Sequence, residues 1–380
     1  MREREQLDIS LARFENIRRT GTLTPLSVLA KRFGRDEAVI SRVIGSAFRS
    51  GLVEVRVIQD EGLASPRRTD LEREILKKYP ALMSAIVISV TDPPESRATS
   101  SEEMLRYSDY VHRFLGTALA REISHGPFIR SGDHVGIGPG RGVYETVRAM
   151  QKQAPVRARD VTLVSLSGVG YMRHHAKNRN LLLDPDFIVA VMGEAFEYPV
   201  ALDLVAAPLV PGPEHSTPFR NWLSSADRAR PTLDMALLGV GVFTPGNRFY
   251  EEASTVTARQ QPAYDPIRAA LQSLRTLSAK FSSEDYIPLG DLGYHIFLIP
   301  PPTDRKMESQ MRSELERQVD AINKYLLSAH RDHFQAIRSA VLIAGTAPKA
   351  RALNHLLAGD LLRIAHVCID KPVAEALLQL

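Results

Sequence analysis

Residues 132–150 read GDHVGIGPGRGVYETVRAM, and this stretch decides the class of fold. It holds a short apolar run at 134–138, a glycine-rich turn, and a segment from Val143 to Met150 with helical spacing. Six further short apolar runs alternate with longer helical segments, at 85–90, 161–166, 202–206, 235–239, 340–344 and 364–369. Such alternation is typical of a mostly parallel sheet covered by helices. We therefore predict an α/β domain over residues 81–380.

Residues 1–60 follow a different pattern. A helix at 26–32 leads into a tight turn at 33–35, and a second helix at 36–48 begins on an aspartate that can cap it. Residues 52–58 then alternate at period two in their middle, as a β-wing would. The apolar stripe of the second helix is Val39, Val43, Ile44 and Ala47. The pattern predicts a winged helix-turn-helix; a helical hairpin used for packing or for protein contacts is the alternative.

The polar face of the second helix is the candidate DNA-binding surface. A recognition helix offers polar groups to the major groove, with basic residues nearby for phosphates. Residues 1–60 hold eleven Lys+Arg against eight Asp+Glu, a net charge of +3, which is most of the formal +4 of the whole chain. The side chains that we predict to face DNA are Arg35, Glu37, Ser41, Arg42 and Arg49.

A linker separates the two patterns. Residues 59–66 are polar and turn-rich, and residues 69–76 read as a capped helix. We therefore predict a DNA-binding domain at 1–60, a linker with a helix at 61–80, and the larger domain at 81–380.

Glycine-rich turns are predicted where the strands of the larger domain end, at 138–142, 167–170, 239–241, 290–293 and 345–349. The backbone N–H groups of such a turn attract an anion at a helix start, and ligands of open α/β sheets lie at the carboxyl ends of strands. We expect Arg141 and Lys349 to contact a phosphate and Asp291 to accept a sugar hydroxyl; a solvent lysine and a turn-stabilising aspartate are the alternatives. The predicted ligand-binding residues are Gly138, Gly140, Arg141, Gly142, Gly168, Gly241, Asp291, Gly345, Thr346 and Lys349.

Several other kinds of site are disfavoured. Cys368 is the only cysteine, which rules out an intrachain disulfide and a thiolate zinc cluster and favours a reducing compartment. The histidines at 174–175 and 330–333 do not form a zinc-protease motif, and the chain lacks the dinucleotide and P-loop fingerprints. We therefore predict no metal and no cofactor. The apolar runs are shorter than about 18 residues, so we expect no signal peptide, no membrane span and a cytoplasmic protein.

Five motifs, in order along nearly the whole chain, carry a family resemblance. They are VISRVI at 39–44 with GLV at 51–53, GDHVGIG at 132–138 with Arg141 and Gly142, DMALLGVG at 234–241, LGDLG at 289–293, and AGTAPKA at 344–350 with residues 370–378. They resemble the recognition helix and wing, the first sugar-site loop, the central strand, the glycine-aspartate loop and the C-terminal end of the SorC/DeoR-like family of bacterial sugar-responsive transcription regulators.

The resemblance implies a winged helix-turn-helix joined to a Rossmann-like effector domain that is related in fold to sugar-phosphate isomerases. It further implies that residues 81–380 bind a sugar or sugar phosphate and mediate self-association into tetramers. The expected partner is double-stranded operator DNA, and the ligand would control the affinity for it.

Two other functions stay open. A sugar-phosphate isomerase or deaminase-like enzyme would need a general base near the reacting carbons. Asp291 could serve, but no motif places a second acid or base beside it, so we predict no catalytic residue and no enzyme. A purely architectural DNA-binding protein would leave the glycine turns unexplained.

Overall fold

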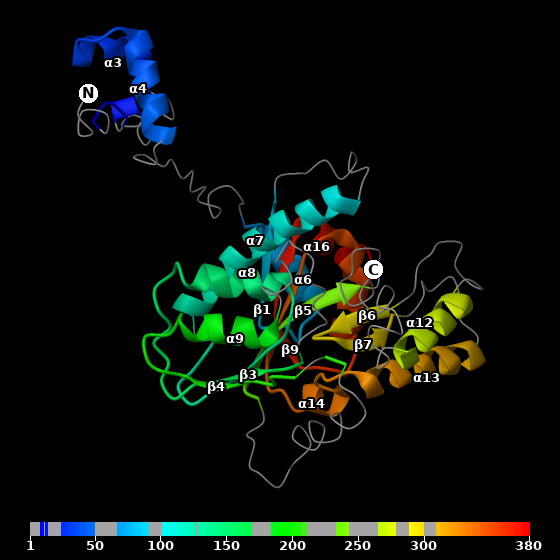
Figure 1. Cartoon of the computed structure of the whole chain (residues 1–380). Helices are drawn as coiled ribbons and strands as arrows, with labels where there is room; N and C mark the ends of the chain where they lie inside the picture. Colours follow the sequence, from blue (N-terminus) through cyan, green and yellow to red (C-terminus); the bar gives the residue numbers. More distant parts are fainter. Residues whose placement is uncertain are drawn as a thin grey trace. The chain divides into compact units, whose positions relative to one another are not determined.

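The computed structural model describes residues 8–10, 12–13, 24–49, 67–90, 101–126, 128–168, 184–207, 209–210, 233–242, 265–278, 289–299 and 309–380. The chain forms two compact units, Met1–Asp60 and Glu61–Leu380 (Figure 1). None of the helices among the described residues is long and apolar enough to cross a membrane.

The first unit holds the predicted helix-turn-helix. Helix α3 (Leu26–Phe33) ends at Gly34, whose φ of 61° is left-handed and whose amide bonds to the carbonyl of Ala30. Glycine takes this conformation without steric cost, so the chain can turn at once into α4 (Glu37–Arg49). The buried core is Ile9, Ala12, Leu29, Ile40 and Val43. The two helices are confirmed, whereas the predicted wing at 52–58 lies outside the described residues.

One detail of the second helix was predicted wrongly. Ile40, which the predicted stripe left out, is fully buried, while Val39 is only partly buried. The stripe contacts α3 through Ile40 and Val43, one helical turn apart on the same face.

The second unit is built on a parallel sheet with the order β1-β9-β8-β5-β2-β3-β4. These strands are β1 (Ser84–Ile88), β2 (His134–Ile137), β3 (Thr162–Ser165), β4 (Ala201–Asp203), β5 (Met235–Val242), β8 (Ala340–Ala344) and β9 (Ile364–Asp370). All seven were predicted from the sequence to within a few residues. The α/β class is therefore confirmed.

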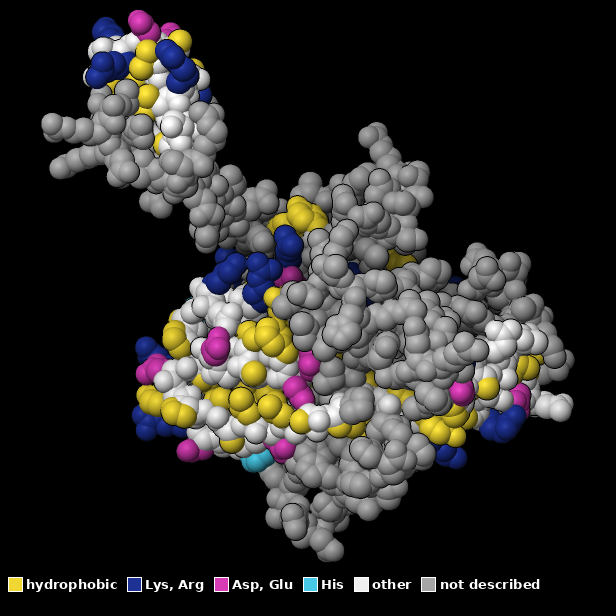
Figure 2. All heavy atoms as spheres, in the orientation of Figure 1, with side chains coloured by type: hydrophobic (Ala, Val, Ile, Leu, Met, Phe, Trp, Pro, Cys, Tyr) yellow, Lys and Arg dark blue, Asp and Glu magenta, His cyan; other side chains and the backbone are white. Residues whose placement is uncertain are grey.

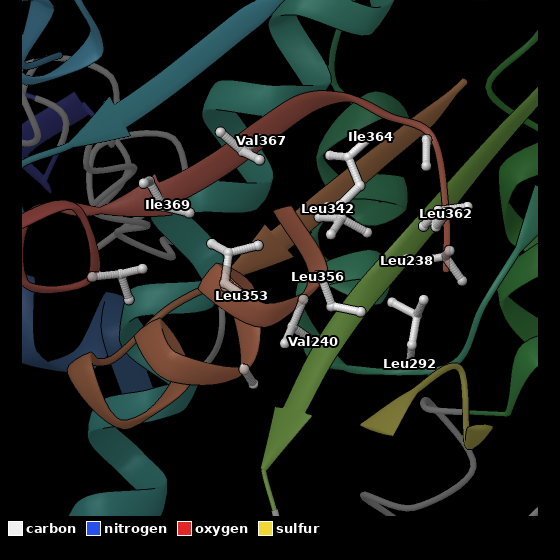
Figure 3. Packing of buried hydrophobic residues seen from close by; sticks show 14 of the residues in the cluster. Leu238, Val240, Leu292, Leu342, Leu353, Leu356, Leu362, Ile364, Val367 and Ile369 are labelled. Atoms are coloured by element: carbon white, nitrogen blue, oxygen red, sulfur yellow. The ribbon is translucent and has the colours of Figure 1, made fainter. Parts of the chain in front are cut away.

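Helices cover both faces of this sheet. Neighbouring residues of a strand point to opposite faces, and here the side chains of both faces are apolar and need to be covered. Val341 and Ile343 of β8 pack in the cluster that contains α7 (Ser101–His125), α8 (Arg141–Met150) and α9 (Pro185–Gly193). Leu342 of the same strand packs in the cluster that contains α6 (Thr69–Lys78), α15 (Ala350–Ala358) and α16 (Lys371–Gln379). Figure 3 shows this second cluster, where Leu353 and Leu356 of α15 face the side chains of β8 and β9.

A smaller subdomain extends from the sheet. Strand β6 (Leu289–Leu292) pairs antiparallel with the end of β5 and with β7 (His295–Leu298). Helices α12 (Asp265–Ser278) and α13 (Ser309–Tyr325) pack beside this hairpin in a third cluster (Figure 1). The short α14 (Arg331–Gln335) follows.

Two predicted turns are wrong. Residues 239–241 do not form a turn, because β5 continues through them to Val242. Residues 290–292 lie in β6, and only Gly293 and Tyr294 form the tight turn to β7. Glycine clusters signalled a turn at both places, but Gly241 and Gly290 serve cross-strand packing instead: a Cβ at Gly290 would lie 2.3 Å from Phe297 of the paired strand.

Candidate functional site: a cationic site at the carboxyl edge of the sheet

The candidate site lies at the edge where the parallel strands end. The turn after β2 carries Gly140 and Arg141, and the turn after β8 leads through the 3₁₀ segment Ala347–Lys349 into α15. Strand β9, the neighbour of β8, ends at Asp370. The carboxyl ends of parallel strands meet at one edge, where open α/β sheets bind their ligands. The structure thus brings together segments more than 200 residues apart in the chain.

The start of α8 can accept an anion. Gly140 precedes the helix with a φ of 124° and supplies no side-chain cap to its first N–H groups. The positive end of the helix dipole therefore lies beside Arg141. Arg141 itself is partly exposed, and its Nε lies 2.9 Å from Oδ1 of Asp109 on α7.

Lys349 reaches the same edge of the sheet from the turn after β8. Its Nζ is 3.2 Å from Nε2 of His112 on α7. The residue retains some surface exposure, but its ammonium group lies among protein atoms. Burial lowers the pKa of Lys349 to about 8, with Arg141 acting in the same direction and Asp291 and Asp370 opposing it. Lys349 is thus within electrostatic range of three charged side chains of the site.

His112 is held in its neutral form. The residue is 3% exposed, and its Nδ1 lies 2.5 Å from the carbonyl oxygen of Ser108. Because a carbonyl only accepts and an ammonium only donates, Nδ1 carries the proton and Nε2 receives the hydrogen bond from Lys349. Burial, and then the charge of Lys349, hold the pKa of His112 well below its usual range. With both ring nitrogens engaged, His112 positions Lys349.

Asp370 holds the turn that presents Lys349. Its Oδ2 accepts the N–H of Thr346 at 2.8 Å, and its Oδ1 accepts the N–H of Val373 at 3.1 Å, capping α16. Thr346 has a φ of 76°, a strained conformation for a residue with a branched side chain. The fully buried Asp370 carboxylate therefore stabilises a turn that would not keep this shape alone.

Three of the predicted glycines are packing residues. A Cβ at Gly138 would lie 2.7 Å from Leu238, and one at Gly142 would lie 2.7 Å from Ile343 and 3.2 Å from His112. Gly138 lets the turn after β2 lie close to β5, and Gly142 lets the first turn of α8 lie close to β8. A Cβ at Gly345 would lie 2.7 Å from Val111 of α7. These glycines shape the site by letting backbone segments meet.

Asp291 and Gly241 form a directly opposed pair across β5 and β6. A Cβ at Gly241 would overlap the carboxylate of Asp291, so that carboxylate lies over the glycine. Asp291 is also close enough to Lys349 for its charge to raise the pKa of that lysine. Gly168 differs from the other predicted residues: its N–H bonds to the carbonyl of Leu327 at 2.7 Å, and the remainder of its turn, 169–170, lies outside the described residues.

Sequence reasoning missed Asp109, His112 and Asp370. Asp370 had a local signal, since an aspartate two residues before a proline is typical of a helix N-cap. Asp109 and His112 had none, because they lie within a helix and meet the site only through tertiary contacts.

The predicted DNA-binding residues are exposed where the structure describes them. Arg35, Glu37, Ser41 and Arg42 all face away from the buried core of the first unit, and the side chain of Arg49 lies outside the described residues. Figure 2 shows several Lys and Arg side chains around the described part of this unit. The surface is therefore polar and rich in cations, as a DNA-binding face requires.

A separate surface hollow of about 730 Å³ lies between β7, α13 and residues 355–361. It contains none of the predicted ligand-binding residues. Its arginines are engaged, Arg312 with Glu316 and Arg331 with Asp360, each at 2.9 Å. Across the described part of the chain, no group of His, Cys, Asp or Glu side chains could hold a metal ion.

The fold is shared with solved structures of transcriptional regulators. Comparison with solved structures finds the full-length sorbitol operon regulator SorC from Klebsiella pneumoniae, at 16% identity, a TM-score of 0.51 and coverage of 99% of both chains. A domain described as sugar-binding, from a transcriptional repressor of Vibrio fischeri, matches at 16% identity and a TM-score of 0.51, covering 82% of this chain and 98% of that one.

A transcriptional regulator from Streptococcus pneumoniae matches at 14% identity and a TM-score of 0.53, with 82% of this chain and 96% of that chain covered. No protein-family model and no curated protein sequence matches the chain. At these identities the likeness establishes the fold. The chain therefore has the fold of the SorC/DeoR-type regulators that the sequence motifs resemble.

Proposed function

We propose that this protein is a transcription regulator whose affinity for operator DNA is controlled by a sugar or sugar phosphate. The observation that carries the proposal is the meeting of Arg141, Lys349 and the uncapped start of α8 at one edge of the sheet. Two cations and a helix N-terminus fit a phosphate group, and Asp291 beside them fits a sugar hydroxyl. The helix-turn-helix of the first unit supplies the DNA-binding half.

The proposal includes the domain limits and the assembly. Residues 1–60 bind DNA, residues 61–80 link, and residues 81–380 bind the ligand and self-associate, with a cytoplasmic tetramer as the working assembly. The full-length sorbitol operon regulator is a structural neighbour, and sorbitol is a sugar alcohol. Each helix-turn-helix would contact one half-site, so a symmetric operator is expected.

An enzyme is the weaker candidate. General acid-base chemistry on a sugar needs a group that can take and release a proton at the ligand. Both nitrogens of His112 are engaged, and both oxygens of Asp370 accept backbone N–H groups. Both of these groups are thus occupied by contacts within the protein, which favours a binding site over a catalytic one.

The test combines three measurements on the full chain. Isothermal titration with D-fructose 6-phosphate, D-glucose 6-phosphate and sorbitol 6-phosphate measures binding, and product analysis of the same mixtures measures turnover. Gel shift with a duplex selected from a random pool by the protein measures DNA affinity with and without each compound. Binding that changes DNA affinity without turnover supports the proposal. Turnover of a sugar phosphate, or the absence of any DNA selection, contradicts it.

A further inference from the structure

Helix α7 has contacts of two kinds. In its first half, Asp109 binds Arg141 and His112 binds Lys349, the two cations of the candidate site. Near its end, Glu122 binds Arg67, with Oε1 at 2.7 Å from Nη1. A rise of 1.5 Å per residue places His112 and Glu122 roughly 15 Å apart along the helix. One rigid element thus touches the site and a second, distant position.

That distant position is the point where the chain enters the sheet of the second unit. Arg67 is the first described residue after 50–66, and it forms an antiparallel bridge with Ile88 of the edge strand β1. The N–H of Arg68 donates to the carbonyl of Val87 at 2.8 Å. Among the described residues, this bridge is the first contact that the chain makes with the sheet.

The bridge is tied to two helices by one ionic network. The guanidinium of Arg67 contacts both Glu72 of α6 and Glu122 of α7. Glu72 is nearly buried, and its Oε1 also accepts the N–H of Val87 at 3.0 Å. Because one arginine serves two carboxylates, a displacement of Glu122 changes the position of Arg67 relative to α6 and β1.

Helix α7 is packed so that it shifts as a unit. A Cβ at Gly116 would lie 2.5 Å from the backbone carbon of Glu145 and 2.7 Å from the backbone nitrogen of Thr146, so the two helix backbones touch there. The inner face of α7 is buried at Phe114, Leu115, Leu119 and Ile123. Closely packed helices shift as units rather than deform.

We propose that α7 couples ligand binding at the cationic site to the position of Arg67, and so to the chain that leads to the DNA-binding unit. The inference rests on the proposed function. An anion held between Arg141 and Lys349 competes with Asp109 for Arg141 and draws the ammonium of Lys349 from His112. Both of the lost contacts belong to α7, so the same event releases this helix at two places. The shift then alters the pairing of Glu122 with Arg67.

The first experiment needs no ligand. Hydrogen exchange of the Arg68 and Val87 amides is compared between the full-length protein and the variants Lys349→Met and Arg141→Gln. Each variant removes one contact of α7, so we expect the exchange of these two amides to change about fivefold or more. The exchange of the β3 amides reports the global stability of each of the two variants. Unchanged exchange at Arg68 and Val87 in both variants, with β3 also unchanged, overturns the proposal.

The second experiment separates the coupling from the ligand site. The variant Glu122→Gln is compared with the matched control Glu197→Gln, which alters an ion pair with Arg157 that does not involve α7. With whichever of the three sugar phosphates binds the wild type, we expect both variants to bind it within about threefold of the wild type. Only Glu122→Gln should lose the response of DNA affinity. A full response in Glu122→Gln overturns the coupling, whereas failure of all three compounds to bind wild type counts against the proposed function and leaves the exchange experiment to decide the coupling.

Discussion

Lys349 donates a hydrogen bond from Nζ to Nε2 of His112, 3.2 Å away, while the other ring nitrogen of His112 faces the Ser108 carbonyl. A cation is thus held by a neutral, buried partner rather than by a carboxylate. This arrangement keeps the ammonium group available to an anion and makes its charge sensitive to pH.

The affinity for a phosphate ester should fall as the pH rises through the pKa of Lys349, which burial lowers to about 8. Below that value the ammonium is charged and attracts the anion; above it the amine is neutral. Between pH 7 and pH 9 we expect about a tenfold loss, since the charged fraction falls by about that factor. Phosphate esters are already doubly ionised over most of this range. Isothermal titration checks the loss, and Lys349→Arg should remove it because a guanidinium stays charged; an unchanged pH dependence in that variant would contradict the assignment.

The stability of the second unit should fall as the pH drops below about 6.5. His112 and His295 both have lowered pKa values because of burial, that of His295 reaching about 4. In the unfolded chain these histidines take up protons near pH 6.5, whereas in the folded protein they stay neutral, so acid favours unfolding. The shift of His295 alone corresponds to about 3 kcal/mol by pH 4. Urea unfolding between pH 7 and pH 5 checks this, and His295→Gln should weaken the dependence; equal slopes for variant and wild type would count against it.

The substitution Gly241→Ala should be far more harmful than Gly239→Ala. A Cβ at Gly241 would overlap the carboxylate of Asp291, while a Cβ at Gly239 would meet only Pro139 O at 3.6 Å. We expect Gly241→Ala to cost about 1–3 kcal/mol by forced displacement. Adding Asp291→Ala should recover part of that loss, because the second change removes the overlapping group. Thermal unfolding of the three variants measures the loss of stability. Equal losses of stability for the two glycine substitutions would refute the opposed pairing of Gly241 and Asp291.

Replacing Asp370 with alanine should weaken both stability and ligand binding. The change removes the cap of α16 and leaves the N–H of Thr346 without this carboxylate. We expect a loss of about 1–3 kcal/mol in unfolding free energy. Binding of fructose 6-phosphate should weaken further, because the turn that presents Lys349 relaxes. Asp370→Asn keeps one acceptor, so its unfolding free energy should fall between those of the wild type and Asp370→Ala. An alanine variant as stable as the wild type would exclude the positioning role.

On the DNA side, Arg42→Ala should weaken binding to the selected duplex by about 1–3 kcal/mol if the side chain reads a base. Arg42 is exposed on α4, and its Nε lies only 3.3 Å from its own helix carbonyl at Ala38, a contact that DNA could replace. Arg73→Ala, an exposed arginine of α6 in the second unit, is the control. Gel shift compares them, and equal affinities for both variants would remove Arg42 from the DNA-binding face.

The sequence by itself determined the seven parallel strands and the two helices of the helix-turn-helix. These depend on local patterns: apolar periodicity, caps, and glycines at chain reversals. Glycine clusters misled at 239–241 and 290–293, because a glycine needed for a cross-strand neighbour looks the same in sequence as one needed for a turn. Only the tertiary structure decided that Asp291 lies over Gly241. It also decided that His112 meets Lys349, 237 residues away, because such a contact is set by strand order and helix packing rather than by any local preference.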